Sequence, residues 1–144
     1  MIRSRKLLGA LALFLATPLA HAGADDFLGY WKNQDESGLV KYIQVKLDKG
    51  KPMIRAYGRC QKGDCYWGGM EAMAFAPSEQ ANLEKDASAV GAYFGDANAK
   101  GILILTPGAG KSLKMEAFAS FPKSKLTNVH KSYTFVPAPE LQGK

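Results

Sequence analysis

The sequence predicts an all-β fold of about eight short antiparallel strands, arranged as a barrel or a sandwich. Two observations carry this prediction. Hydrophobic residues alternate with polar ones along several of the segments between turns, which is typical of strands that bury one face. Turns rich in glycine, proline and aspartate follow at fairly even spacing, and no long amphipathic segment indicates a helix.

The expected strands are short apolar or alternating segments bounded by such turns. The continuously apolar segment Ile102–Thr106 is expected to be buried. Ala117–Phe121 could instead belong to a helix that begins at Ser112, but Pro122 would end this helix early and the alternation fits a strand at least as well. The expected strands are Leu28–Asn33, Leu39–Leu47, Met53–Arg59, Met70–Ala76, Ala89–Phe94, Ile102–Thr106, Leu113–Phe121 and Lys131–Val136.

The first 22 residues are expected to be a cleavable signal peptide. Basic residues precede a short apolar run, Leu7–Leu15, and the segment ends in Ala20-His21-Ala22, which fits a small-x-small cleavage site. The apolar run is shorter than the roughly 20 residues that a transmembrane helix needs. We therefore expect residues 23–144 to form one domain, periplasmic or secreted, without a stable membrane anchor.

Loss of this segment changes the net charge. The full chain has 19 lysine and arginine residues against 13 aspartate and glutamate residues, a net charge of +6. Three of the basic residues lie in residues 1–22, so 16 basic and 13 acidic side chains remain, a net charge of +3. This mild and scattered basicity gives no support for nucleic-acid binding. It also disfavours inhibition of lysozyme, a basic enzyme that would repel the chain.

The two cysteines, Cys60 and Cys65, are expected to form a disulfide because an exported chain meets oxidising conditions. Gly63-Asp64 between them is a turn-forming pair, so the bond would staple a tight hairpin. A redox-active pair usually has the spacing Cys-x-x-Cys at a helix N-terminus, which this segment lacks.

Two short motifs resemble known families. Gly29-Tyr30-Trp31 is similar to the opening of calycin-type barrels, such as lipocalins and avidins, and Trp31-Lys32-Asn33-Gln34 resembles the avidin opening in particular. The resemblance implies a single up-and-down β-barrel with Trp31 plugging one end. The avidin Gly-Ser pattern that binds biotin is missing. The segment from Tyr57 to Gly68 resembles a Cys-x4-Cys-x-Trp-Gly element of exported bacterial domains, which implies no known activity.

The sequence offers few candidates for catalytic residues, and we expect a non-enzymatic protein without cofactor or metal. His130 is the only histidine after the signal peptide, and no acidic partner is suggested by its spacing. The segment Pro107–Ser112 looks like a phosphate-binding loop but lacks its first glycine, so we interpret it as a turn. Carboxylate pairs remain possible among Glu71, Asp86, Asp96 and Glu116.

Aromatic side chains are the best lead to a binding site. If Arg55 and Tyr57 face a barrel interior, they could hold an apolar ligand with an anionic group. In the alternative, the aromatic side chains only fill the core. The candidate ligand-binding residues are Trp31, Arg55, Tyr57, Trp67 and Tyr93.

Two functions are consistent with these features. The first is a binding protein of the cell envelope for a small apolar or amphipathic molecule. The second is an inhibitor or interaction module that uses its loops, notably Pro77–Ser88, against an exported enzyme or other envelope protein. This loop is expected to contain one helical turn from Ser78. A hydrolase would require His130 to contact a carboxylate and a hydroxyl group in a cleft.

Overall fold

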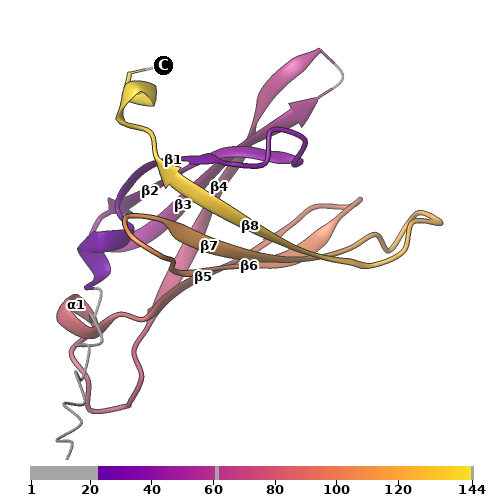
Figure 1. Cartoon of the computed structure of the whole chain (residues 1–144). Coiled ribbons are helices and arrows are strands. Elements are labelled where there is room, and N and C mark those ends of the chain that lie inside the picture. The colour runs from indigo at the N-terminus through magenta and orange to yellow at the C-terminus, as the bar shows by residue number, and fades with distance from the viewer. Residues whose placement is uncertain (1–22, 61, 144) are drawn as a thin grey trace, which may run out of the picture.

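The computed structural model describes residues 23–60 and 62–143, so the expected signal peptide lies outside the described residues. The described chain forms a closed antiparallel barrel in which each strand pairs with the next and β8 returns to β1 (Figure 1). The all-β prediction is thus confirmed, in its barrel form. The strands are β1 (Gly29–Asn33), β2 (Val40–Asp48), β3 (Lys51–Cys60), β4 (Gly63–Phe75), β5 (Ala89–Gly95), β6 (Lys100–Pro107), β7 (Leu113–Ser120) and β8 (Val129–Pro137).

Helical structure in the described residues is limited to single turns. These are η1 (Ala24–Phe27), α1 (Leu83–Asp86) and η2 (Pro139–Leu141). The helical turn expected from Ser78 instead begins after Asn82, whose side chain accepts a hydrogen bond from the Glu84 backbone N–H and so caps α1. No helix in residues 23–60 and 62–143 is long and apolar enough to cross a bilayer.

The barrel interior is filled with side chains from alternate positions of the strands. Ile43, Ile54, Leu105, Met115 and Phe135 are completely buried there. The period of two along each strand places these side chains on the inner face and their neighbours on the outer face. Trp31 lies in the same core, and its indole Nε1–H donates a 2.9 Å hydrogen bond to the Phe27 carbonyl oxygen in η1.

The expectation that the apolar segment 102–106 is wholly buried is wrong. Leu103 and Leu105 are buried, but Ile102 is 48% exposed and Ile104 is only partly buried. A continuous apolar run is buried on both faces only where a second layer covers the sheet. No such layer lies over Ile102, so an apolar outer face is open to solvent.

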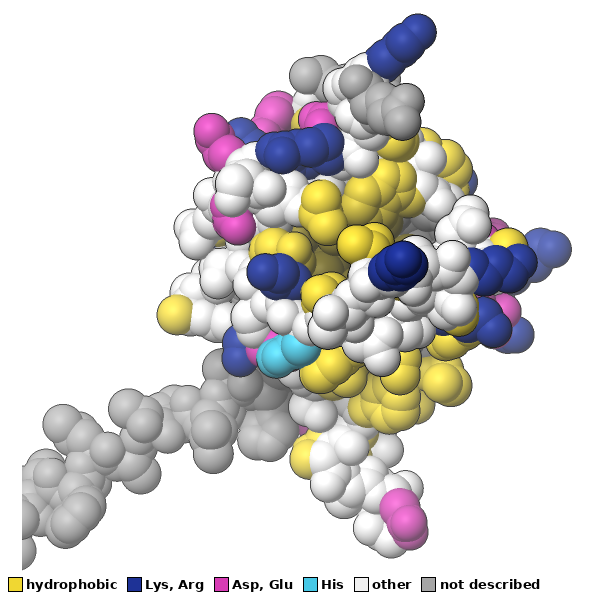
Figure 2. All heavy atoms as spheres, turned by 90° about the vertical axis from the view of Figure 1, so that its right-hand side faces the viewer, with side chains coloured by type: hydrophobic (Ala, Val, Ile, Leu, Met, Phe, Trp, Pro, Cys, Tyr) yellow, Lys and Arg dark blue, Asp and Glu magenta, His cyan; other side chains and the backbone are white. Residues whose placement is uncertain are grey.

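The strand pairing divides the barrel into two halves of four strands. Between the halves, β4 and β5 pair only through Ala72–Phe75 and Ala89–Ala92, and β1 and β8 only through Trp31–Asn33 and Phe135–Pro137. The halves diverge beyond these short seams, toward the β3–β4 and β7–β8 turns (Figure 1). Figure 2 faces this end, where hydrophobic side chains surround a hollow.

The disulfide lies in the protruding β3–β4 hairpin. Cys60 and Cys65 are joined, with their Cα atoms 5.9 Å apart. Gly63-Asp64 is not the turn, because both residues already belong to β4, opposite Cys60 and Arg59. Gly63 adopts a φ of 92°, which a glycine accepts without strain and which starts β4 directly after the turn.

Candidate functional site

A row of large side chains crosses the outer face of the second half of the barrel. Tyr93, Ile102, Phe118 and His130 are successive register partners on β5, β6, β7 and β8. All four point outward, because each lies an odd number of residues from a buried, inward-facing residue of its strand; these are Ala92, Leu103, Met115 and Tyr133. Cross-strand neighbours on one face lie about 5 Å apart, so the row forms a continuous surface.

A groove of about 520 Å³ follows this row and is open to solvent on its outer side. Aromatic and aliphatic side chains, which we call its floor, line it together with polar and cationic groups. The side chains that define it are Tyr93, Lys100, Ile102, Phe118, Asn128 and His130. The groove therefore offers apolar contact beside two side chains that can carry positive charge.

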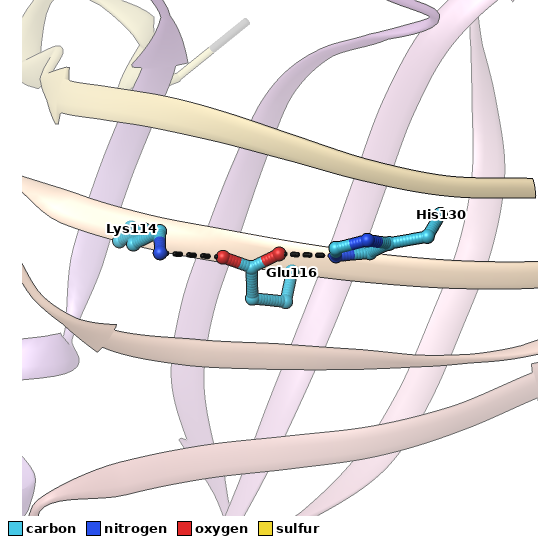
Figure 3. A network of polar contacts seen from close by, with 3 residues as sticks. All are labelled: Lys114, Glu116 and His130. Atoms are coloured by element: carbon cyan, nitrogen blue, oxygen red, sulfur yellow. Dashed lines mark hydrogen bonds and ion pairs between the residues drawn. The ribbon is translucent and has the colours of Figure 1, made fainter.

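His130 is held in the groove wall by two contacts from β7. Its ring stacks on Phe118, with centroids 4.4 Å apart and planes at 7°. Its Nε2 lies 2.5 Å from Oε2 of Glu116 (Figure 3). The stack fixes the ring plane and the carboxylate fixes its direction, so the imidazole is presented to the groove in one orientation.

Glu116 is the centre of a small polar network. Its Oε1 lies 2.7 Å from Nζ of Lys114, and its Oε2 faces His130 from the opposite side (Figure 3). Hydrogen bonds from Lys114, then Ser132 and His130, stabilise the carboxylate and lower the pKa of Glu116 from 4.5 to about 2. Glu116 is therefore ionised at any pH at which proteins normally work.

The network separates the groove from a second, smaller hollow of about 300 Å³ on the same face. Lys114 and Ser132 line that hollow together with the β6–β7 loop. In the loop, the Ser112 hydroxyl donates to the Ala109 carbonyl oxygen at 2.7 Å, and a strand follows instead of a helix. This geometry is that of a turn and lacks the helix N-terminus on which a phosphate-binding loop depends.

The structure does not bring the five predicted ligand-binding residues together. Trp31 is buried in the core, and Arg55 and Tyr57 occupy the outer face of β3, since Ile54 and Ala56 between and beside them face inward. Tyr57 instead lies between two other tyrosines, Tyr42 and Tyr66, at ring distances of 5.6 and 5.2 Å. An interior pocket built on Arg55 and Tyr57 is thus excluded by the direction of β3.

The other two predicted residues lie on opposite halves of the barrel. Trp67 is the extra residue of a bulge in β4, where Ala56 pairs with Gly68 and Tyr57 with Tyr66. Its indole ring covers Gly58 at the open end of the barrel. Tyr93 alone of the five lines the outer groove.

The Glu116–His130 contact is a feature of the candidate site that the sequence reasoning missed. Glu116 and His130 are 14 residues apart in the sequence, a spacing that by itself predicts no contact between them. The signal that could have found the pair is the hairpin register, which sets Phe118 opposite His130 and Glu116 opposite Ser132. The last strand was expected at Lys131–Val136, a range that leaves out His130. In the structure, β8 begins two residues earlier, at Val129, and includes His130.

The network supplies only part of what a hydrolase needs. His130 contacts a carboxylate, but among the described residues no hydroxyl group is hydrogen-bonded to it, and Ser132 bonds to Glu116 instead. In the same part of the chain, no three histidine, cysteine or acidic side chains are grouped as metal ligands. The arrangement can bind and orient a ligand through apolar contact and charge.

Comparison with known proteins gives no further guide. No protein-family model, curated protein or solved structure matches the chain. The groove geometry is therefore the main basis for assigning a function.

Proposed function

We propose that this chain is a non-enzymatic binding protein of the cell envelope that holds a small amphipathic molecule in the outer groove. The observation that carries the proposal is the row Tyr93–Ile102–Phe118–His130, which joins three apolar side chains to an oriented imidazole. The signal-peptide pattern at the N-terminus and the disulfide are consistent with export.

The ligand should have an apolar body and an anionic group. Tyr93, Ile102 and Phe118 provide apolar contact, while Lys100 provides a positive charge at the groove and His130 can donate hydrogen bonds. The negative charge of Glu116 is compensated by Lys114, which reduces its repulsion of an anion. The resemblance of Gly29-Tyr30-Trp31 to calycin openings agrees with a binding role, although the proposed site lies outside the barrel.

The affinity should be moderate, because the groove covers a ligand from one side. A ligand of about 20 non-hydrogen atoms that gains about 0.3 kcal/mol per atom would bind with about 6 kcal/mol. This free energy corresponds to a Kd of tens of micromolar. Such a value suits a molecule that is bound and released, and it sets the concentration range for an experiment.

The test uses the fluorescent amphipathic anion 8-anilinonaphthalene-1-sulfonate. We expect saturable binding, competition by decanoate and much weaker competition by uncharged decanol. Phe118→Ala should weaken binding at least fivefold, because it removes the groove floor and the support of His130. Tyr66→Ala is the matched control, since Tyr66 is also an exposed aromatic residue on the outer face but lies on β4, outside the groove.

Equal affinity of Phe118→Ala and the native protein would overturn the proposed site. Native mass spectrometry of protein taken from its own envelope fraction adds an independent readout. A small anionic molecule that is retained by the native protein and lost in Phe118→Ala would support the proposal.

A protein-interaction role is the second candidate, and the extent of the apolar surface favours it. The exposed face continues beyond the groove to Met73 and Phe75 on β4. Contiguous apolar surface bordered by polar groups is typical of protein interfaces. Most residues of the loop Pro77–Ser88, which this role could also use, are exposed, while α1 within it packs against η1.

A further inference from the structure

The groove is only one wall of a binding site. Ligand sites usually bury most of a small molecule's surface, whereas this groove is open along its outer side. The floor has no lid among the described residues, because no layer covers the outer face of β5 and β6. A second surface is needed to close the site over an apolar ligand.

The same face of the molecule carries a suitable apolar surface. Large side chains on four consecutive strands, β4 to β7, are each between 44% and 66% exposed. The register connects them, since Met73 pairs with Gly91, and Tyr93 two residues later pairs with Ile102. The ring of Phe75 lies against Gly91 and so joins the surface. We call this set the apolar face; it consists of Met73, Phe75, Tyr93, Ile102 and Phe118.

The charges around the apolar face allow it to meet a copy of itself. None of its residues is charged. The carboxylate on its β4 side, Glu71, is paired with Lys51 at 3.0 Å, and the carboxylate on its β7 side, Glu116, is paired with Lys114. Two such faces can approach without placing an unpaired carboxylate against another. The anionic group of a ligand held beside Lys100 would offset the positive charge that each copy brings to the contact.

The size of the apolar face fits a weak, reversible dimer. A large apolar side chain presents roughly 200 Å² when free, and the five residues are about half exposed, so each copy would bury roughly 500 Å². Two copies would bury on the order of 1,000 Å², which is at the lower limit for specific interfaces. Contact through this surface alone should therefore be weak, and a ligand between the copies should strengthen it.

We infer that two copies of this chain pack their apolar faces together about a twofold axis and enclose the groove ligand between them. The axis lies in the interface, runs along the strands and passes between β5 and β6, the middle strands of the face. It lays β4 of each copy, with Met73 and Phe75, over the β7 side and the groove of the other copy. Such an isologous contact is the commonest form of protein dimer. The enclosure of ligand rests on the proposed function.

Sedimentation velocity on the native protein between 5 and 500 µM tests the inference. We expect a reversible monomer–dimer equilibrium, with a dimer Kd that falls at least fivefold when 8-anilinonaphthalene-1-sulfonate is present. Met73→Asp should leave the protein monomeric at every concentration, because it places a charge in the interface. Leu47→Asp is the control, since Leu47 is a similarly exposed apolar residue on β2, outside the apolar face.

Phe75→Asp provides a second variant, and circular dichroism checks that both aspartate variants keep the native fold. A protein that binds the probe but stays monomeric at 500 µM overturns the inference and leaves the proposed function intact. A dimer that is insensitive to both aspartate variants also overturns it, because the contact must then lie elsewhere. A dimer that forms through this face but binds no probe supports the interface and contradicts the proposed function.

Discussion

The imidazole of His130 lies face to face with the phenyl ring of Phe118, with centroids 4.4 Å apart and planes at 7°. The two residues come from β8 and β7 and are directly opposite in the register. The stack connects the apolar floor of the groove to the network around Glu116, so one side chain is both a groove wall and a polar contact.

His130→Phe separates these two roles. The substituted ring can still stack on Phe118, so the free energy of unfolding should change by less than about 1 kcal/mol, as expected for loss of an exposed polar contact. The affinity for 8-anilinonaphthalene-1-sulfonate should fall about fivefold because the nitrogen that can contact the anion is gone. His130→Ala should lose both contributions and bind more weakly still. Equal affinity of His130→Phe and the native protein would show that the imidazole does not contact the anion.

Glu116 should make stability depend on pH in the acid range. Its pKa in the folded protein, about 2, lies below the ordinary value of 4.5. The ionised carboxylate therefore contributes stability above pH 4.5, and the contribution disappears as the pH falls from 4.5 toward 2. Urea denaturation at pH 6 and pH 3 should show a smaller acid loss for Glu116→Gln than for the native protein.

The control for that experiment is Glu140→Gln, which removes an exposed carboxylate outside the network. If Glu116→Gln loses as much stability between pH 6 and pH 3 as the native protein does, the network does not lower the pKa of Glu116. Carbon-13 NMR of the Glu116 carboxyl group gives the same pKa directly.

Two neighbouring residues of β6 should respond very differently to truncation. Leu103→Ala removes a buried side chain and should cost about 2–4 kcal/mol in the free energy of unfolding. Ile102→Ala removes an exposed one and should cost less than about 1 kcal/mol. Urea denaturation of both variants checks which face of β6 is the core, and equal costs would contradict the outward direction of Ile102.

Gly58 should tolerate no side chain, because the Trp67 ring and the Leu39 carbonyl oxygen occupy the space where a Cβ would lie. Gly58→Ala should therefore destabilise the protein by about 1–3 kcal/mol, the range for overpacking. Gly69→Ala on β4 is the control: the nearest atoms to a Cβ there are the Tyr66 hydroxyl at 3.2 Å and the Met53 sulfur at 3.4 Å, both ends of flexible side chains. A near-native denaturation midpoint for Gly58→Ala would contradict the position of Trp67.

Removal of the disulfide should lower stability without changing the barrel. The Cys60–Cys65 bond closes a short loop, so replacing both cysteines by serine should cost about 2 kcal/mol in the chain-entropy account. The hairpin protrudes from the barrel, and the outer groove shares none of its residues. Urea denaturation should show the loss, and probe binding should be unchanged; a loss of binding would connect the hairpin to the site.

Local pattern was sufficient for most of the strands. The alternation in Leu39–Leu47 and in Leu113–Phe121 correctly indicated Ile43 and Met115 as core residues, since a period of two assigns faces within one strand. The same reasoning failed for Ile102 because a continuous apolar run carries no period. Its exposure depends on what covers the sheet, which the strand itself does not encode.

The sequence by itself determined the β class, the expected cysteine pair and the core face of the strands that contain Ile43 and Met115, because these depend on residues close together in the chain. Only the tertiary structure decided that β8 closes onto β1, that Arg55 and Tyr57 point outward, and that Glu116 meets His130. Those facts depend on hairpin register and on the direction of each face around the barrel. Both are set by packing between strands, which the pattern within one strand does not encode, and a shift of one residue would turn every side chain to the other side.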